Sequence, residues 1–187
     1  MTPRELSVLY RDGHLVAINK PAGLLVHRGW ARDRVTALSL VRDLVGQHVH
    51  PVHRLDRATS GVLLFALDPD TTRMMQSQFD EGLVVKNYLL LCRGPLLEGG
   101  LIDHALRKTK EHERRPARTA VRPLASFERY ALVEARPYTG RQHQVRRHLK
   151  HISAPLIGDT RYGKGEHNRR FRRDFELHRL CLHASKT

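Results

Sequence analysis

The sequence predicts a single α+β domain over residues 1–187, and three observations support this prediction. Apolar runs of strand length are separated by turn residues such as Gly, Pro and Asp. Three segments show the periodicity or the N-terminal residues of helices, in stretches distinct from the strands. Of 187 residues, 40% are hydrophobic and 28% charged, which is enough apolar surface for one core.

The first residues predict a β-hairpin. Leu6–Arg11 and His14–Asn19 are apolar-rich, and Asp12-Gly13 between them is a two-residue turn pair that favours positive φ. Lys20-Pro21-Ala22-Gly23 then ends the second strand, because Pro has no N–H for a ladder. Met1–Glu5 lack the apolar core of a signal peptide.

Two helices and a central strand follow. Residues 36–47 have helical periodicity, and Gly61–Leu67 is a continuous apolar strand of the kind covered on both faces. Asp68 is the expected N-cap of the next helix, with Pro69 at its first position. Three apolar side chains of that helix are expected to be buried: Met74, Met75 and Phe79.

The second half is read as further strands and one helix. The expected strands are Leu83–Cys92, Ser126–Tyr130, Ala131–Arg136 and Leu180–His183. Thr139 is the expected N-cap of a helix over Gly140–His151. Lys108–Arg118 is too polar to pack and is read as a hairpin tip or an RNA-facing loop. Arg161–Arg173 is read as irregular.

The charge points to a polyanionic partner. Lys and Arg number 33 against 19 Asp and Glu, a formal net charge of +14. Residues 1–100 carry a net +2 and residues 101–187 a net +12. This asymmetry predicts a basic face, for which nucleic acid is the usual partner. A membrane is not expected, because the basic stretches lack a matching apolar face and no run reaches the roughly 20 residues that span a bilayer.

The densest polar segment beside a predicted core strand is His53-Arg54-Leu55-Asp56-Arg57-Ala58-Thr59-Ser60-Gly61. A loop anchored on a buried strand is where rigid scaffolds place reactive groups. Arg54 and Arg57 flank Asp56 and favour its ionised form, which can act as a nucleophile or general base. The alternative is that Asp56 and Thr59 only form a polar turn.

A second basic cluster spans residues 139–149. On a helix, Arg141, Val145 and His148 share one face, while Arg146 lies on a second face. The alternative is a solvated basic helix that lies on phosphate.

Metal and nucleotide sites are not expected. Among 13 histidines, two groups are close in sequence: His48, His50 and His53, and His143, His148 and His151. Neither group has a Cys pair or the His-Glu-x-x-His spacing of zinc hydrolases, and basic surroundings repel a cation. No Walker-type loop is present, so no cofactor is indicated.

Five motifs in order resemble the RluA family of pseudouridine synthases, from about residue 6 to residue 184. They are Asn19-Lys20-Pro21-x-Gly23, His53-Arg54-Leu55-Asp56-x-x-Thr59-Ser60-Gly61, Lys86-x-Tyr88, Gly140-Arg141-x-His143-Gln144-x-Arg146-x-His148, and Pro155-Leu156-Ile157-Gly158-Asp159-x-x-Tyr162-Gly163. The resemblance implies the pseudouridine synthase fold, a bent mixed β-sheet with flanking helices and a central RNA-binding cleft. It implies isomerisation of a uridine within RNA, without cofactor or metal.

The resemblance also assigns roles to residues. Asp56 matches the catalytic aspartate, which attacks ribose C1′ or the base, or assists glycal formation. Tyr88 matches the tyrosine that stacks on the uracil, and Arg146 the arginine that pairs with the aspartate. Arg54 matches the residue that fills the gap left by the flipped base. The RNA-contacting and base-flipping set is expected to comprise His53, Arg54, Arg57, Thr59, Arg141, His143 and Gln144.

Within the family, the chain looks most similar to the tRNA pseudouridine(65) synthases, with an rRNA uridine as the main alternative. A catalytically inactive RNA-binding protein of the same fold is a further alternative. The chain ends soon after Leu182-His183-Ala184, earlier than the family usually does, and no S4-type module precedes the first motif. We expect a cytoplasmic monomer.

Overall fold

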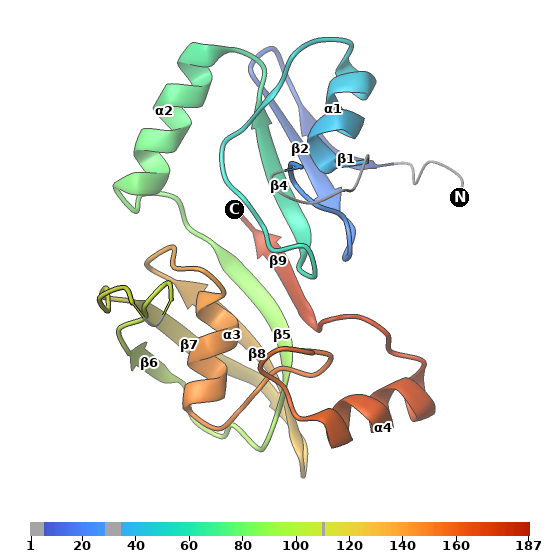
Figure 1. Ribbon diagram of the computed structural model, residues 1–187, viewed down its shortest axis with the longest axis vertical. Coiled ribbons are helices and arrows are strands. Elements are labelled where there is room, and N and C mark those ends of the chain that lie inside the picture. The colour runs from blue at the N-terminus through green and yellow to red at the C-terminus, as the bar shows by residue number, and fades with distance from the viewer. Residues whose placement is uncertain (1–5, 29–34, 110) are drawn as a thin grey trace. The chain divides into compact units, whose positions relative to one another are not determined.

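The computed structural model describes residues 6–28, 35–109 and 111–187. The expectation for Met1–Glu5 lies outside these residues. The chain divides into two compact units, residues 1–84 with Thr187 and residues 85–186, and each is described by itself (Figure 1). The described residues form nine strands and four helices. The predicted α+β class is confirmed, whereas the single domain stays a prediction.

The first unit is an antiparallel sheet with two helices. Strand β2 (Leu15–Lys20) lies between β1 (Ser7–Arg11) and β4 (Ser60–Ala66), and the short β3 (His50–Pro51) also pairs with β4. The predicted hairpin and core strand are therefore confirmed. Cross-strand pairs place the apolar core on these strands, with Val16, Ile18, Leu63 and Phe65 fully buried.

The hairpin turn differs from its prediction. Residues 12–14 lie between the strands, and Gly13 does not take a positive φ. The Asp12 carboxylate instead accepts the backbone N–H groups of His14 and Leu15, both at 2.7 Å. An aspartate side chain that bonds its own following backbone closes a turn without left-handed residues.

The helices of the first unit begin where capping chemistry predicts. Helix α1 (Ala37–Val45) has a capping box between Thr36 and Ser39. Helix α2 (Pro69–Asp80) begins after Asp68, whose carboxylate accepts the Thr71 N–H at 2.7 Å. The expected burial of three side chains on α2 is wrong: Met74 is 55% exposed, and Met75 and Phe79 are only half-buried, because α2 presents a narrow face to the sheet.

The second unit is a larger antiparallel sheet in the order β9-β5-β8-β7-β6. Its strands are β5 (Asn87–Arg93), β6 (Gly100–Asp103), β7 (Arg118–Ser126), β8 (Tyr130–Pro137) and β9 (Leu182–Lys186). The predicted strand over Leu83–Cys92 begins only at Asn87. The predicted strand over Ser126–Tyr130 is wrong, because Ser126 ends β7, Tyr130 begins β8, and residues 127–129 make the turn between them. Strands β6 and β7 were not predicted.

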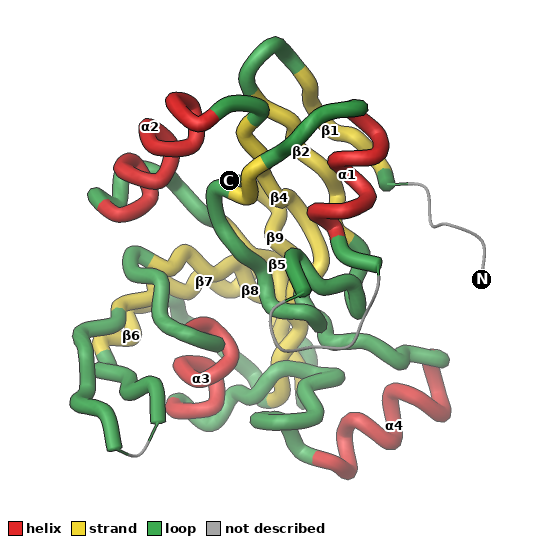
Figure 2. Tube along the Cα trace, turned by 45° about the horizontal axis from the view of Figure 1, so that its top comes forward, coloured by secondary structure: helices red, strands yellow, loops and turns green. Residues whose placement is uncertain are grey.

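Helix α3 (Gln144–His151) packs on β7 and β8, and Figure 1 shows it lying across that face of the second unit. It begins at Gln144 and not at Gly140, so Thr139 is not its N-cap and Arg141 precedes it. The polar connection between β6 and β7 runs beside α3 (Figure 2), where Arg147 donates to the Arg107 carbonyl at 3.0 Å.

The segment predicted to be irregular contains helix α4 (Gly165–Phe175). Its anchors are few: Asn168 and Phe171 are buried, and the Phe171 ring packs edge-on against Tyr130, with ring centroids 4.9 Å apart. A helix with so narrow an apolar face gives little periodicity in the sequence.

Candidate active site

Asp56 lies on the turn that leads into β4. The Thr59 N–H donates to the Asp56 carbonyl at 3.0 Å, and Thr59 and Ser60 are buried at the start of the strand. Asp56 itself is half-buried and Arg54 is exposed. The polar segment at residues 53–61 therefore places a carboxylate and a long cationic side chain on one rigid turn.

A buried cation that the sequence analysis gave no role lies near Asp56. Lys20 is 0% exposed, and its ammonium donates to the carbonyls of Pro21, Leu24 and Arg57 at 3.0, 2.9 and 3.3 Å. Burial lowers the pKa of Lys20 from 10.5 to about 8, and attraction to the Asp56 carboxylate partly opposes that shift. Lys20 thus supplies positive charge to Asp56 from inside the unit.

Arg57 links the motif at residues 19–23 to the polar segment at residues 53–61. Its Nε donates to the Gly23 carbonyl at 3.1 Å, and its own carbonyl accepts the Gly23 N–H at 2.7 Å. Gly23 has a φ of 89°, a conformation that side chains rarely adopt. The two loops are held as one body, with Lys20 bonded to both.

His53 is tied to the interior of the first unit. Its Nε2 accepts the Leu64 N–H at 3.2 Å, and its ring stacks on Phe79 with centroids 4.9 Å apart. The side chain therefore links β4 to α2. Its expected contact with RNA stays a prediction.

Replacing Lys20 with Met is expected to destabilise the protein by about 2 kcal/mol or more, because buried carbonyls lose their donor. The pH dependence should change as well. Since the folded-state pKa of Lys20 lies below that of the unfolded chain, its protonation linkage raises stability between about pH 8 and pH 10.5. Denaturant unfolding across that range should show the rise in wild type and a smaller one in the variant. Identical pH profiles would contradict this account.

Tyr88 lies on β5, between β8 and β9. Its directly opposed partners are Ala135 and Ala184. Because directly opposed residues share a face, the half-buried Tyr88 side chain has a small alanine directly opposite it in each neighbouring strand. A half-buried ring opposite small residues is suited to the predicted stacking on a base.

Arg146 forms a buried ion pair with Asp159. Its Nε and Nη2 donate to the two Asp159 carboxylate oxygens at 2.8 and 3.0 Å. Burial raises the pKa of Asp159, but the Arg146 hydrogen bonds and the N–H groups of Tyr162 and Arg161 outweigh it, so this pKa lies below 3.8. The sequence analysis gave Asp159 no role.

Two glycines fix the Asp159 loop. Gly158 has a φ of 77°, and a Cβ there would lie 1.9 Å from the Arg179 carbonyl oxygen. A Cβ on Gly163 would lie 2.3 Å from the Asp159 carbonyl oxygen. Asn168 completes the loop, accepting the Gly158 N–H at 2.8 Å and donating to the Asp159 carbonyl at 2.9 Å.

Gln144 organises the start of α3. Its Oε1 accepts from the Thr139 hydroxyl at 2.6 Å and the Arg141 N–H at 3.0 Å, and its Nε2 donates to the Thr119 hydroxyl at 3.0 Å. Arg141 also donates from Nε to the Pro116 carbonyl at 3.1 Å. Gln144 is buried, so these bonds describe a positioning role.

His143 and Arg146 both contact Tyr162. His143 has a left-handed φ of 54°, and its Nδ1 lies 3.0 Å from the Tyr162 hydroxyl. The guanidinium of Arg146 lies 5.1 Å from the centre of the Tyr162 ring, within cation–π range. Tyr162 is therefore a shared partner of two predicted site residues.

Within the described residues, no three or more His, Cys, Asp or Glu side chains are placed to hold a metal ion. His148 illustrates why the histidines do not cluster as ligands. Its Nδ1 lies 2.9 Å from the Thr119 hydroxyl and its Nε2 lies 3.0 Å from the His104 carbonyl.

Comparison with known proteins identifies the family of the chain. A family model described as RNA pseudouridylate synthase matches residues 14–151, which include Asp56, Tyr88 and Arg146. The chain belongs to the RNA pseudouridylate synthase family.

Relatives of this pseudouridine synthase match nearly all of it. One is named tRNA pseudouridine synthase C, from Vibrio parahaemolyticus serotype O3:K6 (strain RIMD 2210633), and is 44% identical over 209 residues, covering 100% of this chain and 85% of the relative. Its namesake from Haemophilus ducreyi is 46% identical over 202 residues, covering 96% and 83%. The solved Human RNA Pseudouridylate Synthase Domain Containing 1 has a TM-score of 0.81 at 26% identity, covering 98% and 79%.

The expected family, fold and enzyme class of the pseudouridine synthase are thus confirmed, and the enzyme is an isomerase. Among the described residues, no helix is long and apolar enough to cross a membrane. The roles of individual site residues stay predictions. Lys20 and Asp159 stood within the quoted motifs, and a charged residue at the end of an apolar strand was the one signal that pointed to Lys20.

Proposed function

We propose that this enzyme converts a uridine of tRNA to pseudouridine, with Asp56 as the catalytic carboxylate. The observation that carries the proposal is the Asp56 turn, anchored by Lys20 and Arg57, in a chain whose full-length relatives are named tRNA pseudouridine synthase C. A fixed carboxylate near a buried cation is pre-organised for reaction, because little needs to move when charge develops.

The reaction is balanced within one nucleotide. The bond from N1 to ribose C1′ breaks, the uracil rotates, a bond from C5 to C1′ forms, and the C5 proton leaves while N1 gains one. Asp56 attacks C1′ or the base, or assists glycal formation. No oxidant, reductant or nucleotide enters this balance, so we propose that no cofactor takes part.

A stacked base must leave its helix before this chemistry can occur. The exposed Arg54 extends from the same turn as Asp56, which suits a side chain that fills the vacated space. We assign Arg57, Arg141 and His143 to the RNA-facing shell. The buried or bonded groups of His53, Thr59 and Gln144 support positioning roles in that shell.

Tritium release from RNA labelled at uridine C5 tests the function. Release from tRNA and none from rRNA supports the proposal, whereas release from rRNA alone assigns the other substrate. Binding of either RNA without release would identify an inactive RNA-binding protein.

We also propose that the enzyme is cytoplasmic and monomeric. Light scattering tests the monomeric state.

Replacing Tyr88 with Phe should keep stacking and most RNA affinity, while turnover falls if the hydroxyl moves the C5 proton. Replacing Tyr88 with Leu should lose both, because stacking contributes about 1–3 kcal/mol per base. Single-turnover tritium release and filter binding measure the two effects. Wild-type turnover in the Phe variant would limit Tyr88 to stacking.

A further inference from the structure

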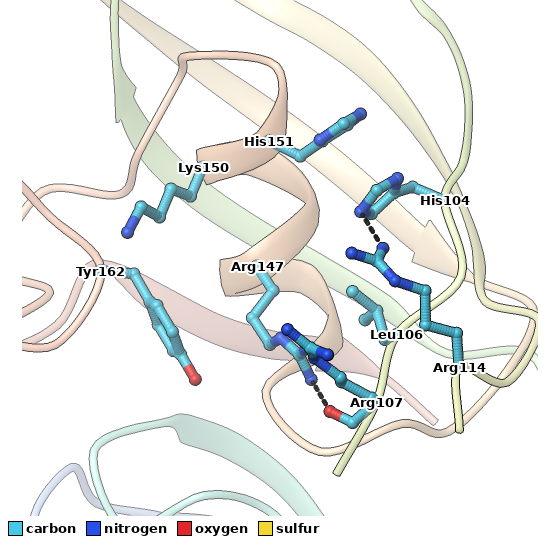
Figure 3. A pocket seen from close by; sticks show the side chains of 8 residues that line it. All are labelled: His104, Leu106, Arg107, Arg114, Arg147, Lys150, His151 and Tyr162. Carbon is cyan, nitrogen blue, oxygen red and sulfur yellow. Dashed lines mark hydrogen bonds between the residues drawn. The ribbon is translucent and has the colours of Figure 1, made fainter. Parts of the chain in front are cut away.

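A basic cavity of about 340 Å³ lies between helix α3 and the β6–β7 connection. Figure 3 shows His104, Leu106, Arg107 and Arg114 on one side of α3, and Lys150 directed toward Tyr162 on the other. Six of the lining side chains are basic or imidazole groups: His104, Arg107 and Arg114 from the connection, and Arg147, Lys150 and His151 from α3. None of the lining residues is acidic. Clustering these charges without a carboxylate is costly unless an anion arrives.

The cavity is held in shape before any ligand binds. Arg147 donates from Nη1 to the Arg107 carbonyl at 3.0 Å, which ties the connection to α3 (Figure 3). Arg114 donates from Nη1 to His104 Nε2 at 3.3 Å and to the Ala105 carbonyl at 3.2 Å. Two guanidinium groups are therefore anchored at one nitrogen each, in a form suited to paired contacts with phosphate oxygens.

The surroundings of His104 favour its neutral form. A guanidinium can only donate, so the contact with Arg114 requires an unprotonated Nε2 on His104. Its ring also stacks on His151, with centroids 3.7 Å apart. Burial, and then repulsion from His151, Arg114 and Arg147, lower the pKa of His104. The His148 ring lies nearby, with centroids 6.4 Å apart. A bound anion would oppose that repulsion.

The cavity is also joined to Arg146. Tyr162 forms part of its wall, with the Lys150 ammonium 5.9 Å and the Arg146 guanidinium 5.1 Å from the ring centre. Arg146 itself faces Asp159, whereas Arg147 and Lys150 line the cavity. An occupant would thus lie against the same aromatic ring as a predicted catalytic residue.

We propose that this cavity holds a backbone phosphate of the RNA substrate, contacted by the guanidinium groups of Arg114 and Arg147, while the Lys150 ammonium adds positive charge from the side of Tyr162. The inference rests on the proposed function, since it takes RNA as the ligand. The volume exceeds that of one phosphate and leaves room for an attached ribose. Tyr162 offers that sugar an apolar wall, which a free inorganic phosphate would not use.

The test is the salt dependence of tRNA affinity for paired variants. Replacing Arg114 and Lys150 with Gln should lower the slope of log affinity against log salt by about 1. The matched control replaces Arg73 and Arg122 with Gln, because each has a carboxylate partner of its own, Asp70 and Glu134. The control slope should equal that of wild type. Equal slopes for all three proteins would overturn the proposal.

A second measurement separates RNA from free phosphate. Inorganic phosphate and tRNA are each titrated while the imidazole signals of His104 are followed by NMR. Both should raise the pKa of His104, with tRNA acting at far lower concentration. A response to inorganic phosphate alone, with unchanged RNA slopes, would assign the cavity to a free phosphate and overturn the RNA proposal. If the enzyme releases no tritium but the salt slopes of the Arg114 and Lys150 variant still differ from wild type, the proposed function is rejected and the phosphate site is kept.

Discussion

Replacing Asp56 with Asn is expected to reduce pseudouridine formation by roughly 10³-fold or more, because the amide can neither attack nor accept a proton. RNA affinity should stay within a few-fold, since the side chain keeps its size. Loss of the carboxylate also removes the attraction that favours the charged form of Lys20. The pKa of Lys20 should therefore fall further. Tritium release and pH-dependent unfolding measure the two effects.

The control for this variant is Asp43→Asn on helix α1. Asp43 is exposed and pairs with its neighbour Arg42, so the same chemical change there should leave turnover and stability near wild type. Near-normal turnover in the Asp56 variant would show that another group performs the chemistry. A large loss of RNA affinity would show that Asp56 acts in binding instead.

Replacing Arg146 with Met is expected to lower the free energy of unfolding by about 3–5 kcal/mol, because Asp159 is left as an uncompensated buried charge. Turnover should fall too, since Tyr162 and the Asp159 loop lose their common partner. Arg146→Lys should recover only part of the stability, because an ammonium cannot make two parallel bonds to the carboxylate. The expected pairing of Arg146 with Asp56 stays a prediction, and it is separate from this ion pair.

A double-mutant cycle isolates the pair. Asp159→Asn keeps an oxygen for the N–H groups of Arg161 and Tyr162, so the double variant with Arg146→Met should be more stable than the two single losses predict. The exposed pair of Arg122 and Glu134 provides the control, with an expected coupling of about 1 kcal/mol or less. Additive losses at the buried pair would contradict this interpretation.

The ion pair of Arg146 and Asp159 should also affect the stability of the protein at acidic pH. The folded-state pKa of Asp159 lies below its unfolded value, so its stabilisation is present above about pH 3.8 and is lost as the pH falls through the folded-state pKa. Wild type should therefore lose stability more steeply on acidification than Asp159→Asn. Parallel acid-unfolding curves would argue against a depressed pKa.

The parts of the fold that the sequence predicted correctly are those set by local chemistry. Asp68-Pro69 begins a helix in any context, and the strand from Gly61 is apolar throughout. Helix α3 was placed four residues early because the buried Gln144 side chain takes the Thr139 hydroxyl, which otherwise caps a helix. That competition arises only when β7 brings Thr119 beside Gln144.

The candidate site also contains residues that local sequence identifies and residues that only tertiary contacts identify. Asp56 is identifiable because carboxylates, cations and hydroxyls concentrate beside an apolar strand. Asp159 is separated from Arg146 by 13 residues, and its pairing depends on a loop shaped by Gly158. The place of Lys20 at the end of an apolar strand did not show that it is fully buried, because that burial depends on the carbonyls of Pro21, Leu24 and Arg57, which come from two loops far apart in the sequence. Partners of this kind are set by tertiary structure.

Because Lys20 is buried, its chemical modification measures local opening of the loop that covers it. While Lys20 is buried, about half of its amine is neutral at pH 8, and the neutral amine is the form that acylating reagents attack. Yet no reagent can reach it while residues 21–24 stay bonded to Arg57. The rate of acylation at this one lysine therefore counts how often the loop opens. The acylation rate therefore measures local opening of the segment next to Asp56 in the free enzyme, without RNA.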